Sequence, residues 1–240
     1  DPSTSNDIPN GVTAHLTVIT SDGTSLANYY GGIAYFTDLQ GQFWKLNLSK
    51  TSLGDLNSVM FGLVNSFRAQ SSLSNDRLGF NQLASTVVSS SGSYQVIHYF
   101  GTGDQTRIQR RASSINNRIY GVSDPNFPAV GLVNQNQTVS SSSFMSINSS
   151  SCTFGKSWWG NVYQKANFSP TGYEKIIGRA TVYNGNILFT SYQPDTVAAC
   201  PITGTSRIIE MTSNCGSTTL SGTILGRGLA TAPVVDAKGN

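Results

Sequence analysis

Residues that could carry out chemistry are few in this sequence, and their spacing does not fit the usual sites. His15 and His98 each lack a second histidine or a cysteine at metal-ligand spacing, so the sequence predicts no zinc site. His98 stands between Ile97 and Tyr99, which favours a structural role over a catalytic or ligand role. No Gly-x-Ser-x-Gly elbow accompanies the many serines. We therefore predict that the chain is not an enzyme and needs no cofactor.

Three aspartates stand at equivalent places, each directly after a predicted strand: Asp38, Asp104 and Asp195. If those strands belong to repeated units, the three carboxylates would emerge on one face, where they could gather a cation or a donor-rich ligand. Aspartate also stabilises turns by hydrogen bonding to its own backbone. We expect the turn role, and the ligand role remains the alternative.

The one cluster of basic residues lies in a predicted loop and consists of Arg107, Arg110, Arg111 and Arg118. Such a loop is either simply solvated or a patch on which a partner docks. Fifteen Lys and Arg against twelve Asp and Glu give a net charge of +3. Nucleic-acid binders usually carry a much denser basic face, so we predict no nucleic-acid partner.

Cysteine usage gives a hint about the compartment. The three cysteines allow at most one internal disulfide, and the short spacing favours Cys200 with Cys215 over pairs that include Cys152. Free thiols are the alternative. A disulfide would fit an extracellular location, because oxidising compartments are where such bonds persist.

The composition of the 240-residue chain suits one globular domain over residues 1–240. Charged residues make up 11% of the chain, against about 25% in typical domains, so Ser, Thr, Asn and Gly must keep it soluble. No run approaches the roughly 18 apolar residues of a spanning helix. The start of the sequence has neither the basic nor the apolar region of a signal peptide. We expect a soluble chain, or a mature or excised piece of one.

The elements that position these residues are predicted to be almost all strands, because Val, Ile, Thr, Tyr and Phe recur in short runs between turn residues. Three hairpins are expected, at 33–48 around Gly41, at 95–103 with 117–124, and at 186–192 with 206–211. A strand of small and β-branched residues precedes each hairpin, at 12–20, 84–88 and 178–183, and a fourth such strand stands at 228–235. Residues 60–64 are a candidate outer strand, and residues 127–171 are expected to form an irregular polar insert.

This repeat predicts an all-β fold, a partial β-propeller of about three to four blades. A β-sandwich is the alternative, because it also has short strands and glycine-rich turns. Three blades and a fraction cannot close a ring, so open blade faces and strand edges would remain.

Motifs in the predicted hairpins give the sequence a resemblance to the C-terminal propeller of the PilY1/PilC family of type IV pilus proteins. A segment similar to that family's Asp-Leu-x-Gly-x-x-Trp hairpin is followed by a Phe-Gly-Thr-Gly strand end and then by a strand with an aromatic residue and a final Asp. The matching residues are Asp38, Leu39, Gly41, Trp44, Phe100, Gly101, Thr102, Gly103, Tyr120 and Asp124. The segments 184–206 and 228–235 also resemble the family's last blade and the strand after it, and the order agrees.

The resemblance implies a non-enzymatic protein at the cell surface, the pilus tip or the outer membrane that supports pilus assembly and surface adhesion. Its partners would be minor pilins or pilus tip components, a host or abiotic surface, and the rest of its own polypeptide or a second chain that completes the propeller. The family often carries an Asp-rich calcium loop before the first hairpin. Here that place holds Asp22 among hydroxyl residues, too few carboxylates for calcium, so we do not predict calcium binding.

Two other functions remain as alternatives. Trp158, Trp159 and Tyr163 could form stacking platforms of a carbohydrate-binding or other adhesive extracellular module. A quinone-dependent dehydrogenase also uses a propeller, but it would need an eight-bladed ring, a cation site and a vicinal disulfide, none of which the sequence shows.

The short glycine motifs Gly101-Thr102-Gly103 and Gly226-Arg227-Gly228 do not have the length of a phosphate-binding loop, and neither opens a predicted helix. We expect these glycines to serve turns or close packing.

Overall fold

The computed structural model describes residues 10–20, 32–48, 62–68, 77–90, 93–111, 115–124, 127, 145–146, 158–161, 174–195, 204–213 and 221–236. Every regular element in these ranges is a β-strand, and the fourteen strands form three sheets. The described residues contain no helix that is long and apolar enough to cross a membrane. The all-β prediction is confirmed.

The first sheet is a four-stranded antiparallel meander in the order β1-β2-β3-β4. It contains β1 (Thr17–Ile19), β2 (Ile33–Thr37), β3 (Gln42–Asn47) and β4 (Gly62–Arg68). Gly41 in the turn between β2 and β3 has a φ of 71°, which glycine adopts without steric cost. The predicted hairpin at 33–48 and the outer strand after it are both present.

The second sheet has the order β5-β6-β7-β9-β8. Its strands are β5 (Ala84–Ser90), β6 (Ser93–Gly101), β7 (Arg118–Asp124), β9 (Trp158–Asn161) and β8 (Met145–Ser146), with β8 parallel to β9. The sequence predicts an irregular insert over 127–171, yet the chain takes β8 and β9 from it. An unpaired β7 would expose its backbone edge, and the aromatic pair in β9 has high strand propensity.

The third sheet places both β10 (Lys175–Ile176) and β11 (Thr181–Tyr183) beside β12 (Asn186–Pro194). β13 (Gly204–Thr212) and β14 (Ser221–Arg227) follow as the next antiparallel neighbours. Both turn residues between β11 and β12, Asn184 and Gly185, have positive φ, as a tight hairpin requires. The third predicted hairpin, 186–192 with 206–211, is present as the antiparallel pair of β12 and β13. The strand ahead of it is divided into β10 and β11, which both pair with β12.

The sequence predicts that residues 228–235 form a strand, the first of a fourth blade. In the structure this segment forms no backbone ladder. Side-chain hydroxyls hold it instead: Thr190 Oγ1 donates to the Thr231 carbonyl at 2.9 Å, and Ser206 Oγ donates to the Gly228 carbonyl at 2.6 Å. One backbone bond, from the Gly228 amide to the Gly204 carbonyl at 2.9 Å, also holds the segment, but it is not continued as a ladder.

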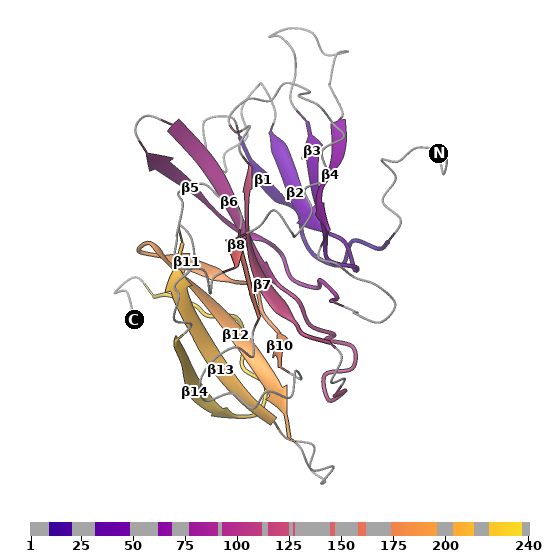
Figure 1. Cartoon of the computed structure of the whole chain (residues 1–240), viewed down its shortest axis with the longest axis vertical. Coiled ribbons are helices and arrows are strands. Elements are labelled where there is room, and N and C mark those ends of the chain that lie inside the picture. The colour runs from indigo at the N-terminus through magenta and orange to yellow at the C-terminus, as the bar shows by residue number, and fades with distance from the viewer. Residues whose placement is uncertain are drawn as a thin grey trace, which may run out of the picture.

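The three sheets follow one another in chain order (Figure 1). The core lies in two layers, one between the first and second sheets and one between the second and third. Strand β6 is buried on both faces. Val96 and Phe100 enter the cluster shared with the first sheet, whereas Ile97 and Tyr99 enter the cluster shared with the third. A middle sheet covered on both sides fits consecutive blades of a partial propeller better than a two-layer sandwich, whose sheets each bury one face. We call the three sheets blades 1, 2 and 3.

Candidate functional site

Asp38 closes the turn of the first hairpin. The carboxylate is fully buried, where Oδ1 accepts a hydrogen bond from the Gln42 amide at 2.9 Å and Oδ2 accepts one from the indole Nε1 of Trp44 at 3.1 Å. The Gly41 amide also donates to the Asp38 carbonyl at 2.9 Å. The carbonyl of Leu39, the next residue of the turn, accepts a hydrogen bond from the amide of Gly79, which lies in the segment that leads to blade 2. Asp38 therefore serves the turn and the tryptophan, leaving no carboxylate oxygen directed at a ligand.

The Phe-Gly-Thr-Gly strand end is the junction between blades 2 and 3. A Cβ atom on Gly101 would lie 2.4 Å from the side chain of Ile176, and one on Gly103 would lie 2.6 Å from Cβ of Lys175. The Ile176 amide donates to the Thr102 carbonyl at 3.1 Å. The glycines are thus required for close packing, one of the two roles that the sequence predicts for them, the other being turns.

Asp124, at the end of β7, joins blade 2 to blade 1. Its Oδ2 accepts hydrogen bonds from the Tyr35 hydroxyl at 2.7 Å and from Lys45 Nζ at 2.6 Å. Burial and the nearby carboxylate raise the pKa of Tyr35, so its hydroxyl stays protonated and donates. Tyr120 of the same motif strand is also buried and stacks on Phe100, with ring centroids 5.0 Å apart. These motif residues hold blades together.

His98 lies in the same junction but cannot act as a general base near neutral pH. Its ring lies against that of Tyr35, with the centroids 3.9 Å apart and the planes tilted by 37°, and Nδ1 lies 2.7 Å from Ser85 Oγ. Complete burial lowers its pKa to about 3, with the attraction of Asp124 acting in the opposite direction. Its Nε2 has no hydrogen-bond partner, so no carboxylate orients the ring as a catalytic triad would. The structural role is the one this geometry supports.

The other two aspartates of the predicted set also serve local structure. Asp104 Oδ1 accepts from the amides of Thr106 and Arg107, each at 3.1 Å, and Oδ2 accepts from Arg107 Nε at 2.6 Å. Burial alone would raise the pKa of Asp104. The hydrogen bond from the Thr106 hydroxyl, at 2.7 Å, and the bonds and charge of Arg107 hold that pKa below its usual value. Asp195 pairs with Arg227 of β14. Within the described ranges, no three His, Cys, Asp or Glu side chains gather where a metal ion could bind.

The predicted basic loop is anchored to blade 3. Lys175 Nζ donates to the carbonyls of Ile108 and Arg110, at 3.0 and 2.6 Å. Burial of Lys175 is the main cause that lowers its pKa to about 8. Arg107 and Arg110 are exposed on this loop, whereas Arg111 is half-buried beside them and Arg118 is half-buried at the start of β7. The loop therefore presents guanidinium groups from a fixed backbone.

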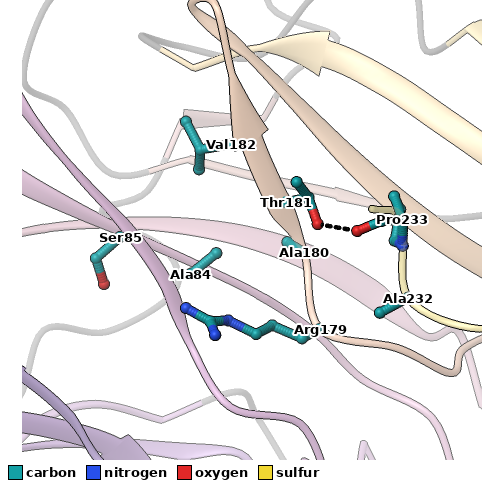
Figure 2. A pocket seen from close by; sticks show the side chains of 8 residues that line it. All are labelled: Ala84, Ser85, Arg179, Ala180, Thr181, Val182, Ala232 and Pro233. Carbon is teal, nitrogen blue, oxygen red and sulfur yellow. Dashed lines mark hydrogen bonds between the residues drawn. The ribbon is translucent and has the colours of Figure 1, made fainter. Parts of the chain in front are cut away.

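An open hollow of about 400 Å³ lies between β5 of blade 2 and the residues leading into β11 of blade 3 (Figure 2). Small apolar side chains form most of its wall, and the segment 232–233 closes one side. Its polar groups are Ser85, Arg179 and Thr181. No spacing in the sequence brings these residues together, because they come from separate blades.

Three other sequence predictions concern residues outside those that the structure describes. They are the disulfide of Cys200 and Cys215, the partner of Cys152, and Asp22, at the place where the resembling family often carries a calcium loop. For the predicted stacking residues the structure gives the backbone of β9 at Trp158 and Trp159, and Tyr163 lies outside the described part.

Several residues of the blade junctions were not singled out from the sequence. Lys45 and Tyr35 bind Asp124, and Glu174 lies buried beside Ser191 and Arg207. One signal in the sequence could have indicated this pair. Lys45 stands among apolar residues in the strand 42–47, and a buried lysine usually requires an acidic partner.

Comparison with known proteins gives a likeness of fold alone. No protein-family model matches the sequence, and none of the curated proteins matches it. The structure is similar to the crystal structure of the C-terminal domain of Pseudomonas aeruginosa PilY1, with a TM-score of 0.65 and 14% sequence identity. The likeness covers 94% of this chain and 57% of that chain, so the sequence spans little more than half of the solved domain. This chain therefore has the fold of part of the PilY1 C-terminal domain.

Proposed function

We propose that this chain is a non-enzymatic, pilus-associated β-propeller part that supports type IV pilus assembly and surface adhesion. The observation that carries the proposal is the likeness to the PilY1 C-terminal domain over 94% of the chain. The resembling motif residues support it, because Asp38, Gly101 and Asp124 each hold a turn or a blade junction that such a fold needs. The chain would act at the pilus tip, the outer membrane or the cell surface.

The surface proposed for docking minor pilins or other pilus tip components is the loop 104–111. Arg107 and Arg110 are exposed on it, and Lys175 fixes its backbone to blade 3. A preorganised loop loses little conformational freedom when it binds. Guanidinium groups suit carboxylates of a partner, because they donate paired hydrogen bonds in a fixed plane.

The test is made in the source bacterium. Deletion of the gene is expected to reduce piliation seen by electron microscopy and attachment to a surface, and the wild-type gene is expected to restore both. A variant with Arg110→Ala, which keeps the pair of Arg107 with Asp104, is expected to fold and yet restore neither fully. Gln40→Ala is the control, because Gln40 is an exposed polar residue in the turn of the first hairpin, outside the loop. A deletion strain that keeps pili and attachment would contradict the proposed function.

We also propose that further propeller strands of its own polypeptide cover the apolar face at the end of blade 3. Four large apolar residues are exposed there: Ile224 at 63%, Leu225 at 53%, Leu229 at 63% and Val234 at 85%. Large apolar side chains exposed on an edge strand and on the segment after it favour an interface over contact with water. The solved PilY1 domain extends beyond the part that this chain matches, which supports blades as the occupant.

Native and denaturing mass spectrometry of protein purified from the source tests this second proposal. One polypeptide longer than 240 residues is expected under both conditions. A 240-residue chain alone would contradict the proposal, and two different polypeptides would replace it with completion by a second chain.

A further inference from the structure

The segment that leads into each blade is bonded to the end of the hairpin in the blade before it. The Gly79 amide donates to a carbonyl in the turn of the first hairpin at 3.0 Å, and the Ile176 amide donates to the carbonyl that follows β6 at 3.1 Å. At the end of blade 3, the Gly228 amide donates in the same way to the carbonyl of Gly204, the first residue of β13, at 2.9 Å. The segment after Gly228 therefore has the place of a segment that leads into a fourth blade.

Threonine hydroxyls mark where the first strand of the next blade begins. Thr17, the first residue of β1, donates through Oγ1 to the Leu83 carbonyl at 2.9 Å, and β5 begins at the residue that follows Leu83. Thr181, the first residue of β11, donates through Oγ1 to the Pro233 carbonyl at 2.5 Å (Figure 2). By this equivalence, the first strand of a further blade would begin at Val234.

Val234 does not have the cover that its equivalent in blade 2 has. Ala84, at the start of β5, pairs with Tyr99 of β6 and is 3% exposed, whereas Val234 is 85% exposed. In the described part of the chain, no strand pairs with Val234 or Val235. Two β-branched residues in succession favour a strand, and an open strand edge readily accepts a further strand.

The strands that pair with the first strand in the three blades indicate which kind of strand would fit beside Val234. These are β2, β6 and β12, and each pairs antiparallel with the first strand of its own blade. Each also carries a buried tyrosine two residues before its end, at Tyr35, Tyr99 and Tyr192. The fitting partner is therefore an apolar, aromatic strand of a propeller hairpin rather than a charged peptide.

We propose that Val234 and Val235 begin the first strand of a fourth blade and pair antiparallel with an apolar hairpin strand of the same polypeptide that lies outside residues 1–240. The inference rests on the proposed further propeller strands at the end of blade 3, and it adds the backbone segment on which they dock. The solved PilY1 domain extends beyond the part that this chain matches, which supports a strand of the same polypeptide as the occupant. Pairing at this segment would set the register of the next blade.

The test is hydrogen exchange of the protein purified from its source, measured by mass spectrometry that resolves single amides, with the chain of residues 1–240 as the comparison. The amides of Val234 and Val235 are expected to exchange about a hundredfold more slowly in the source protein, because ladder amides exchange only when the strands separate. Equal exchange in the two proteins would overturn the proposal and leave the further propeller strands standing. A source protein of 240 residues alone would overturn both, and protection by a second polypeptide would overturn the choice of occupant.

Val234→Asp gives a second, independent measurement. In the chain of residues 1–240 this substitution is expected to leave thermal stability unchanged, because the side chain is 85% exposed there. In the source protein it should lower the protection of the Val235 amide by about tenfold or more, because it places a charge between paired strands. Val87→Asp is the matched control, since Val87 is an exposed valine of β5 whose strand already pairs with β6, and its effect should be equal in the two proteins. An effect of Val234→Asp that is no larger in the source protein than in the chain would overturn the proposal.

Discussion

Gly101 at the end of β6 and Ile176 in β10 are in such close contact that a Cβ atom on the glycine would lie 2.4 Å from the isoleucine side chain. β10 thereby sits directly on the end of the blade 2 hairpin. The Ile176 amide completes the contact by bonding to the Thr102 carbonyl. The junction of blades 2 and 3 therefore requires glycine at position 101, because the methyl group of an alanine there would overlap Ile176.

Gly101→Ala is expected to destabilise the chain by about 1–3 kcal/mol, because inserting a methyl group into a packed junction forces side chains and backbone to shift. Gly11→Ala is the matched control, since a Cβ atom there meets nothing within 4 Å. Urea unfolding followed by tryptophan fluorescence measures both variants. An equal loss of stability in the two would show that close packing is not the reason for glycine at position 101.

The bond between Asp38 and Trp44 is expected to contribute to the stability of the first hairpin. Asp38→Ala removes this bond and the one to the Gln42 amide and leaves both buried donors without an acceptor, which should cost about 2–4 kcal/mol. Trp44→Phe removes the indole donor and part of the packing. A double-mutant cycle of the two substitutions, measured by chemical denaturation, is expected to show a coupling of about 1 kcal/mol or more. Additive effects would contradict the bond.

Lys45 is expected to compensate the buried charge of Asp124. Lys45→Met keeps most of the stem and removes the cation, so Asp124 retains a charge whose ionic partner is gone. Breaking a buried pair costs about 3–5 kcal/mol, and the 18% exposure of the lysine side chain reduces our expectation to about 2–3 kcal/mol. Adding Asp124→Asn to Lys45→Met should restore part of the loss. A double variant less stable than Lys45→Met would contradict this account.

Glu174 and His98 are expected to give stability opposite dependences on pH. Burial is the main cause that raises the pKa of Glu174 to about 7 from an ordinary 4.5, so the folded chain holds a proton that the unfolded chain releases between those values. Stability from this group therefore falls as pH rises from 4.5 to 7. The pKa of His98, about 3 against 6.5, makes stability rise with pH between 3 and 6.5.

The Glu174→Gln variant separates the two contributions. Its stability should rise from pH 3 to 6.5, whereas the unchanged chain should be nearly level between 4.5 and 6.5, where the two slopes oppose each other. The difference in unfolding free energy between variant and unchanged chain should grow by about 3 kcal/mol from pH 4.5 to 7, at about 1.4 kcal/mol per unit. Thermal melts in a pH series measure this, and a constant difference would contradict the raised pKa of Glu174.

The sequence determined the hairpins of this protein, because their signals are local. Runs of β-branched and aromatic residues marked the strands at 33–48, and Gly41 and Gly185 marked the turns where a positive φ is needed. The split of the inner strand of blade 3 and the strands within 127–171 were not predicted. Their pairing depends on which edges lie open after the hairpins form, and no local pattern encodes an open edge.

Only the tertiary structure decided what the motif residues do. Asp124 is an ordinary strand-end aspartate in the sequence, and its partners Tyr35 and Lys45 lie 89 and 79 residues away. The glycines at 101 and 103 likewise acquire their role from β10, which stands far along the chain. Local spacing determines backbone conformation through sterics and hydrogen bonds between near neighbours. Contacts between blades, and the hollow beside Arg179, arise from the packing of whole sheets, which brings together residues that the sequence keeps apart.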